Sequence, residues 1–157
     1  RRQLERGTAS HNTLIVNDTN SSDVWHGFRV GKRAKTTILK ENKNVVIASH
    51  NGYRQWNLEI HRKFETVDAQ LVITDNVLGH ISNHKVNGAL HFHPDVKIYL
   101  DKNYIHVHDK LTINIEGATN IHVASYQYAQ GFNDLVDALK VVYTLANDKV
   151  IISINSN

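Results

Sequence analysis

Apolar and polar residues alternate along most of this chain, with the period of two that is typical of β-strands. In LTINIE, Leu111, Ile113 and Ile115 fall on one face, and polar residues occupy the other. The segments DVKIYL (95–100) and YIHVHD (104–109) follow the same pattern. Further strands are predicted at 13–17, 28–40, 44–49, 56–65, 69–75, 86–93, 120–126, 139–145 and 149–154.

Short polar turns separate the predicted strands, among them NDTNSSD, KENKN, HNGY, EGATN and LANDK. Only residues 131–142 could hold a helical turn. About a dozen short strands with hairpin-sized connections predict an all-β fold, a two-sheet antiparallel β-sandwich. A chain of 157 residues fits a single domain, residues 1–157, that can bury a core without covalent or metal staples.

The composition excludes several classes of protein. No apolar run approaches the roughly 18 residues of a membrane-spanning helix, so we expect no membrane span. The absence of cysteine excludes disulfides and thiolate zinc sites. The chain also lacks methionine and opens with RRQLERG, so we interpret it as a piece of a longer protein. The lack of a signal peptide then says nothing about localisation.

Charge is distributed unevenly along the chain. Residues 1–63 carry 12 Lys and Arg against 5 Asp and Glu, a net charge of +7, whereas residues 64–157 carry 6 against 10, a net charge of −4. A cationic first part suggests an anionic partner, and a solvated cationic sheet face explains it equally well. Nucleic acid is not expected as a partner, because the basic residues are not interleaved with an aromatic stacking motif.

Eleven histidines are many for this length. Two pairs, His91 with His93 and His106 with His108, have the i, i+2 spacing that puts both rings on one face of a strand. Neutral imidazole is a common zinc ligand, but no third ligand can be assigned for either pair. The glutamate that follows such a pair in cupins is missing after HFHPDV. Structural or exposed histidines are therefore favoured, and a metal-dependent, cupin-like enzyme is the distant alternative.

One histidine stands out by its position at the mouth of a predicted strand. His11 follows small residues, precedes Asn12 and lies near Arg6 in the sequence. Such a loop histidine could contact a bound anion, or it could be a surface residue that only begins the strand. The residues alone leave both interpretations open.

The string ERGTASHNTLIVND, followed by VWHGFRVGKRA, resembles the C-terminal β domain of the heparinase II/III-like proteins, a group of bacterial polysaccharide lyases. ASHNGY, HRKFE, LVITDNVLG and HFHPDV continue the pattern in the same order. The resemblance covers about residues 5–96, and the remainder fits as generic strand. The HNT block followed by W-x-x-F-R-V-G-x-R-A is its most specific part.

The resemblance implies an N-terminal α/α toroid, which is not in this chain, and an acidic polysaccharide such as heparan sulfate or alginate bound between toroid and sandwich. The implied reaction is β-elimination at a uronate, and the implied setting is periplasmic or secreted in a bacterium. The family's active-site histidine of the β domain maps to His11, whereas its catalytic tyrosine and the helping Asn or His belong to the toroid. The full-length protein would then be a lyase, and this chain alone would be inactive.

Other residues acquire roles from the same resemblance. Asn12, Arg29, Arg33 and Tyr53 are candidate substrate-binding residues. In an extended strand Arg29 and Arg33 share a face and suit carboxylate or sulfate binding, although salt bridges would use them equally well. Tyr53 could face substrate or be a core tyrosine with a paired hydroxyl.

No cofactor is required by this interpretation, and no metal site is predicted. Several relatives bind a structural zinc through a histidine two positions after the catalytic one, and Thr13 occupies that position here. His50 could match another ligand position, but one residue does not make a site. A bound divalent metal is thus only an alternative. A non-catalytic carbohydrate-binding or scaffold domain is the second candidate function, and the sequence does not identify the sugar.

Overall fold

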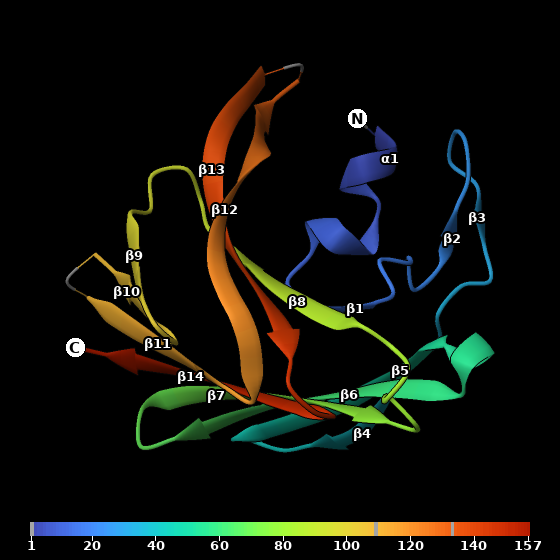
Figure 1. The fold of residues 1–157 in the computed structure, drawn as a ribbon, viewed down its shortest axis with the longest axis horizontal. Helices are drawn as coiled ribbons and strands as arrows, with labels where there is room; N and C mark the ends of the chain where they lie inside the picture. The colour runs from blue at the N-terminus through green and yellow to red at the C-terminus, as the bar shows by residue number, and fades with distance from the viewer. Residues whose placement is uncertain (1, 109, 133) are drawn as a thin grey trace.

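Antiparallel strands form most of the chain in the computed structural model, which describes residues 2–108, 110–132 and 134–157 (Figure 1). The strands are β1 (Leu14–Val16), β2 (Asp23–Val24), β3 (Val30–Gly31), β4 (Thr36–Glu41), β5 (Val45–Tyr53), β6 (Leu58–Val67), β7 (Gln70–Leu78), β8 (Val86–His91), β9 (Ile98–Asp101), β10 (Tyr104–Val107), β11 (Leu111–Glu116), β12 (Ala118–Gly131), β13 (Asp134–Leu145) and β14 (Lys149–Ser156). The short helices are α1 (Arg2–Glu5), η1 (Thr8–Ser10) and η2 (Arg54–Trp56). Among the described residues, no helix is long and apolar enough to cross a membrane.

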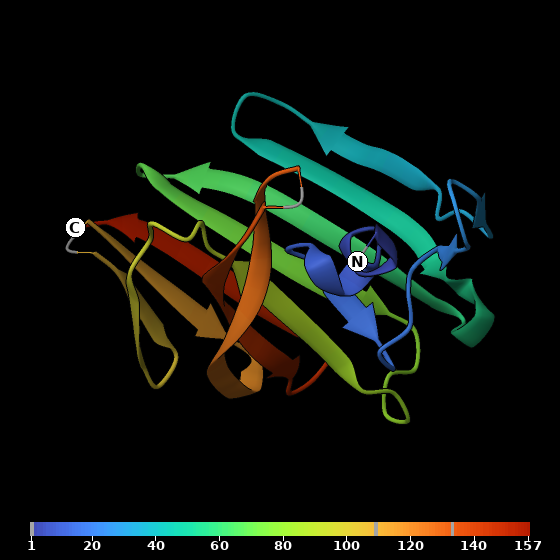
Figure 2. The same ribbon diagram turned by 90° about the horizontal axis from the view of Figure 1, so that it is seen from above.

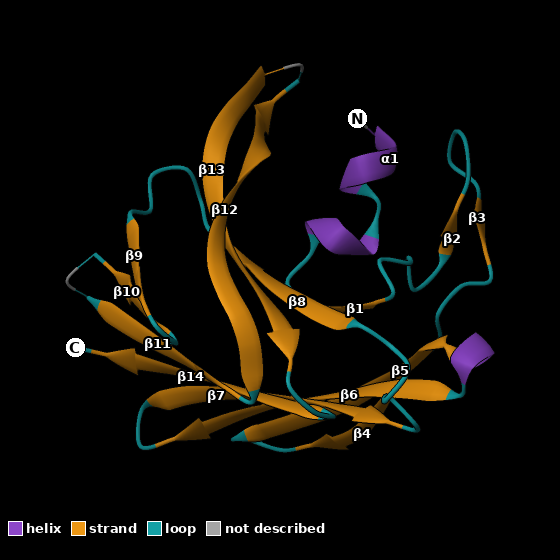
Figure 3. Cartoon of the chain, viewed as in Figure 1, coloured by secondary structure: helices purple, strands orange, loops and turns teal. Residues whose placement is uncertain are grey.

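Two sheets face each other across the core (Figures 1 and 3). The larger sheet has the strand order β4-β5-β6-β7-β14-β11-β10-β9, and the smaller sheet has the order β1-β8-β13-β12. The strands β2 and β3 form a separate hairpin. This arrangement confirms the two-sheet antiparallel sandwich that the alternating pattern predicts.

The core follows from the same alternation. Ile113 and Ile115 on β11 are buried and pack with Val150 and Ile152 of β14, while Glu116 is exposed. Burying each such aliphatic side chain contributes about 1.5–3 kcal/mol relative to leaving it exposed. The smaller sheet supplies the opposite wall of the core through buried residues of β1, β8 and β13: Leu14, Val16, Val86, Val141, Tyr143 and Leu145.

A glycine allows the smaller sheet to hold a large aromatic ring. Gly88 on β8 lies directly opposite Tyr143 on β13, and the Tyr143 ring covers it. A Cβ at position 88 would come within 2.3 Å of the Tyr143 Cζ atom. The Tyr143 side chain is buried in the core, so it has little room to move away.

Replacing Gly88 by alanine should therefore destabilise the protein by about 1–3 kcal/mol, the usual cost of overpacking. Gly131→Ala is the matched control, because the nearest atom of the described residues that a Cβ there would meet is 3.7 Å away. Urea unfolding of both variants measures the difference. An unchanged unfolding midpoint for Gly88→Ala would show that the Tyr143 ring can be displaced at no cost.

Two predictions about the strands are wrong. Residues 28–40 do not form one strand, because Lys32 adopts a φ of 39° that ends β3 and starts a loop to β4. Residues 131–142 hold no helical turn where the structure describes them, since β13 begins at Asp134 and pairs with β12 and β8; residue 133 of that segment lies outside the described residues. Cross-strand pairing with β12, joined by β8 from Lys140 onward, outweighs the local helical preference.

Candidate functional site

The N-terminal segment, residues 2–12, lies on the side of the smaller sheet that faces away from the larger sheet, between the β12–β13 and β2–β3 hairpins (Figures 1 and 2). The buried Thr8 fixes it, donating its N–H to Asn20 Oδ1 (2.7 Å) and accepting the Ser21 N–H on Oγ1 (2.9 Å). The helix η1 then ends at Ser10, and the N–H of the next residue, His11, donates to the Thr8 carbonyl (3.1 Å). The backbone of His11 is thus held while its side chain is exposed.

A buried ion pair supports this loop from within the sandwich. Arg62 on β6 donates two hydrogen bonds to Asp75 on β7, Nε to Oδ1 (2.6 Å) and Nη2 to Oδ2 (2.7 Å). The Asp75 side chain is 0% exposed. The remaining guanidinium nitrogen, Nη1, donates to the backbone carbonyl of Asn12 (2.5 Å). Arg62 therefore connects the core of the protein to the residue beside His11.

Asn12 connects the same loop to β8. Its Oδ1 accepts the backbone N–H of His91 (2.8 Å) and lies 2.9 Å from His91 Nδ1. Because an amide oxygen can only accept, this contact places the proton of the neutral imidazole on Nδ1. The His91 Nε2 then carries a lone pair that can accept a hydrogen bond.

His91 lies in a partly buried, positively charged setting. Its ring meets the Tyr126 ring edge-on, with centroids 4.9 Å apart, and Lys140 lies directly opposite it in the β8–β13 pair. Burial, then the charges of Lys140 and His11, lower the pKa of His91 from 6.5 to about 4. His91 is therefore neutral near pH 7, and it lies close enough to His11 for their charges to interact.

This shift predicts a loss of stability in acid. Between pH 6.5 and about 4 the unfolded chain protonates His91 while the folded protein does not, so the free energy of unfolding falls as the pH falls through that window. Urea unfolding at several pH values measures this effect. Carboxylates titrate in both proteins, so the free energy of unfolding should fall with pH in both, but less steeply for His91→Gln than for the unsubstituted protein. Equal slopes would contradict the neutral, buried state of His91.

A pocket of about 370 Å³ opens beside His91, between the N-terminal segment and the β12–β13 hairpin. Tyr126, Tyr128 and Lys140 line it on the sheet side. The full lining is Leu4, Glu5, Ala9, Ser10, His91, Tyr126, Gln127, Tyr128, Ala129 and Lys140. We call this space the hairpin pocket. It combines two aromatic rings, a neutral imidazole and a cation, a set that can bind a polar ligand carrying negative charge.

The expectation that Tyr53 faces a ligand is corrected by the structure. Tyr53 is 0% exposed and its hydroxyl donates to the carbonyls of Leu14 and Thr19, each at 3.3 Å. Burial raises its pKa to about 12. Tyr53 stacks against Trp56, so it is the core tyrosine with a paired hydroxyl that the sequence left as the alternative.

Arg29 and Arg33 flank β3, and the β2–β3 hairpin lies on the other side of the N-terminal segment from the β12–β13 hairpin (Figure 1). Both are exposed, and the turn at Lys32 removes the shared strand face that the sequence predicts for them. Arg6 joins the β2–β3 hairpin to the N-terminal segment by donating to the Arg29 carbonyl (3.3 Å). The structure thus brings His11 and Asn12 together with His91, and it sets Arg29 and Arg33 apart from them. Their substrate-binding role stays a prediction.

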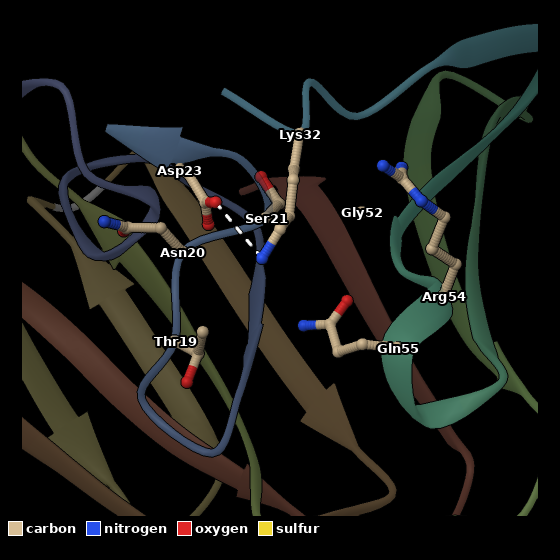
Figure 4. A pocket seen from close by; sticks show the side chains of 8 residues that line it. All are labelled: Thr19, Asn20, Ser21, Asp23, Lys32, Gly52, Arg54 and Gln55. Atoms are coloured by element: carbon tan, nitrogen blue, oxygen red, sulfur yellow. Dashed lines mark ion pairs between the residues drawn. The ribbon is translucent and has the colours of Figure 1, made fainter. Parts of the chain in front are cut away.

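A second hollow, of about 500 Å³, lies near the β2–β3 hairpin (Figure 4). It is lined by Thr19, Asn20, Ser21, Asp23, Lys32, Gly52, Arg54 and Gln55. Lys32 pairs with Asp23 at 3.4 Å (Figure 4). None of the five candidate site residues from the sequence lines either pocket. The hairpin pocket is the stronger candidate because His91, which lines it, is joined to Asn12, whereas Lys32 of the second hollow is already neutralised.

The histidine pairs differ from each other in the structure. The rings of His91 and His93 each meet a tyrosine edge-on, Tyr126 and Tyr128 respectively. His106 and His108 do not share a strand face, because β10 ends at Val107 and His108 has a φ of 47°. No group of three or more His, Asp or Glu side chains that could hold a metal occurs among the described residues.

We expect folding to be independent of metal. His50, the remaining candidate ligand, accepts the Gly52 N–H on Nδ1 (3.3 Å), and burial followed by the charge of Arg62 lowers its pKa. Thermal unfolding with and without a chelator should give the same midpoint. A large drop on chelation would reveal a ligand set that is absent from the described residues, because a metal bound only to the folded state stabilises it.

Several residues of the site escape sequence reasoning. Arg62 and Asp75 look like ordinary strand charges, although Asp75 falls on the inward face of an apolar run, LVITD, which is a usable signal. Tyr126 and Tyr128 have the same i, i+2 spacing as the histidines they meet. Lys140 gives no signal in the sequence, since its proximity to His91 depends on the register of β8 with β13.

Fold and site together define a two-layer antiparallel β-sandwich with an imidazole- and tyrosine-lined pocket on its smaller sheet. Residues 1–150 match the family model described as "Heparinase II/III-like, C-terminal", and the chain belongs to this family. The resemblance carried by the HNT and W-x-x-F-R-V-G-x-R-A blocks is therefore confirmed. No curated protein matches the chain.

Solved structures share the fold. Heparinase III, the BT4657 gene product, in a form with methylated lysines, superposes with a TM-score of 0.74 at 16% identity over 99% of this chain. The heparan sulfate lyase HepC from Pedobacter heparinus superposes with a TM-score of 0.69 at 16% identity over 98% of this chain. The chain spans 25% of the length of each of these proteins. At this identity the likeness concerns the fold.

Proposed function

We propose that this chain is the β domain of a lyase that cleaves a uronate-containing acidic polysaccharide by β-elimination, with His11 as its contribution to a split active site. The observation that carries the proposal is an exposed imidazole on a loop held by hydrogen bonds to Arg62 and His91. Arg62 holds the Asn12 carbonyl and Asn12 holds His91, so the position of His11 is defined although its ring is free to meet a substrate. Membership of the heparinase II/III-like family supports it.

The chemistry explains why a histidine is useful there. A base removes the proton at C5 of the uronate, the bond from C4 to the glycosidic oxygen breaks, and a C4–C5 double bond forms while the leaving oxygen takes up a proton. The C5 proton is weakly acidic until the charge of the neighbouring carboxylate is neutralised. His11 would either neutralise that carboxylate as an imidazolium or take part in proton transfer.

The remaining catalytic groups are proposed to lie in an N-terminal α/α toroid that supplies a tyrosine and an Asn or His. The solved relatives are about four times as long as this chain, since it covers 25% of each. Heparan sulfate, named for one of them, and alginate are the candidate substrates, and the protein would be periplasmic or secreted in a bacterium. We propose residues 1–157 as one domain of that larger protein.

An assay of the full-length protein and of the 157-residue chain tests this function. Both are incubated with heparan sulfate, alginate and other polyuronates, and the ultraviolet absorbance of unsaturated uronate is followed. We expect product from the full-length protein only. Binding without product would favour the alternative, a non-catalytic carbohydrate-binding domain. Product from the 157-residue chain alone would contradict the split site.

A further inference from the structure

We propose that the hairpin pocket is a subsite that binds one acidic sugar residue of the polysaccharide, with Lys140 as the cation that recognises its carboxylate or sulfate. This inference rests on the proposed function and extends it to a part of the chain, β12 and β13, that the sequence motifs do not reach. The pocket adjoins the loop that carries His11 and Asn12, because His91 lines the pocket and its N–H is bonded to Asn12.

Lys140 is the first element of the argument. It lies on β13 directly opposite His91 of β8 and directly opposite Ala124 of β12, so neither of its cross-strand neighbours carries a negative charge. Its ammonium group makes no ion pair with any described residue, unlike Lys32 and Lys63. A half-buried cation without a partner is costly unless a ligand or solvent compensates it. An anionic group on a sugar supplies that compensation through a charge-assisted hydrogen bond.

The tyrosines are the second element. Tyr126 and Tyr128 alternate along β12 and therefore project on one face of the sheet. The Tyr126 hydroxyl donates to the Phe92 carbonyl (2.7 Å). The Tyr126 ring meets the His91 ring edge-on. The Tyr128 ring meets His93 in the same way, with centroids 5.0 Å apart. Both rings are thus fixed beside the pocket, where they offer apolar surface to the C–H groups of a sugar.

The third element is the neutral imidazole. With its proton on Nδ1 directed at Asn12 Oδ1, His91 leaves Nε2 free to accept a hydrogen bond from a sugar hydroxyl. The Glu5 carboxylate also lines the pocket, on the N-terminal wall, and it repels an anionic group there. An acidic sugar would therefore bind with its anionic group toward Lys140 and away from Glu5, and with its hydroxyls toward His91.

Oligosaccharide binding to the full-length protein tests the subsite. A heparan sulfate hexasaccharide, a mannuronate hexamer and neutral cellohexaose are titrated calorimetrically into a His11→Ala background, in which cleavage of the probe should be slower by about two orders of magnitude. Lys140→Met should weaken binding of the acidic probe about tenfold, the usual scale of one charge-assisted contact. The loss should shrink as salt rises. Lys149→Met, an exposed lysine at the start of β14, is the control and should bind like the parent.

A second variant covers the aromatic wall. Tyr128→Leu keeps an apolar side chain but removes the ring, and it should weaken binding at every salt concentration. Parent-like binding by both Lys140→Met and Tyr128→Leu would overturn the subsite while leaving the lyase proposal intact. If binding depends on Lys140 but the full-length protein with His11 intact shows no turnover, the subsite is supported and the lyase proposal is contradicted. Failure of the parent to bind any acidic probe would overturn both.

Discussion

Replacing Arg62 by methionine should destabilise the protein by about 3–5 kcal/mol, because removing one partner leaves the other charge buried and unpaired. Methionine keeps most of the length of the side chain but none of the guanidinium donors. The Asp75 carboxylate is 0% exposed, so water cannot replace the two hydrogen bonds that Arg62 donates to it. Equilibrium unfolding in urea measures the loss.

Two further variants isolate the ion pair. Arg62→Met combined with Asp75→Leu should recover much of the lost stability, because an apolar pair of similar volume often replaces a buried ion pair at little cost. Lys63→Met is the neighbouring control. Its ion pair with Glu65 (2.7 Å) is partly exposed, and such pairs are worth at most about 1 kcal/mol. Equal losses for Arg62→Met and Lys63→Met would show that burial does not strengthen the Arg62–Asp75 pair.

The ion pair also explains why the loop that carries His11 has a defined position although it is exposed. Arg62 uses two donors on Asp75 and a third on the Asn12 carbonyl. Since the guanidinium is planar and rigid, fixing two of its donors fixes the direction of the third. A lysine at this position would lack that geometry. The buried charge is thus better understood as a device for positioning the loop than as a source of stability.

The fold could be predicted from the sequence because alternation is a local signal. Residues such as Ile113 and Ile115 report their buried face directly, and the turns between strands carry Asn, Asp and Gly. The failures occur where long-range pairing or one dihedral angle decides. No residue pattern in FRVGKRAK predicts the φ of 39° at Lys32. In β13 the alternating pattern predicts strand only at 139–145, whereas residues 134–138 are strand because they pair with β12.

The candidate site was predictable only in part, for the same reason. The motif around His11 singles out one loop, but the residues that surround this loop come from distant positions in the sequence. His91 is 79 residues from Asn12 and Arg62 is 50 residues away. Tyr53 shows the opposite error, since a motif position suggested a ligand contact and the structure buries the ring. Lys140 and Tyr126 have side chains suited to ligand binding, but they are too far from His11 in the sequence to be assigned to its site without the structure.

In the full-length protein, provided that it is an active lyase, His11→Ala should lower the turnover number by about two orders of magnitude or more, the scale of acid–base and electrostatic contributions to catalysis. The reason is chemical, because alanine can neither neutralise the uronate carboxylate nor exchange a proton. Stability should change by no more than about 0.5 kcal/mol, since exposed side chains have few core contacts to lose. His11 is exposed, and its hydrogen bonds come from the backbone.

His106→Ala is the control for this prediction. His106 lies on β10, toward the far edge of the larger sheet, where its ring stacks on Tyr99 with centroids 6.1 Å apart. It should retain turnover, which shows that loss of a histidine as such is harmless. Full activity of His11→Ala would remove His11 from the reaction. A loss of activity that merely follows the unfolded fraction, measured by circular dichroism on the same samples, would make His11 a structural residue at the start of β1.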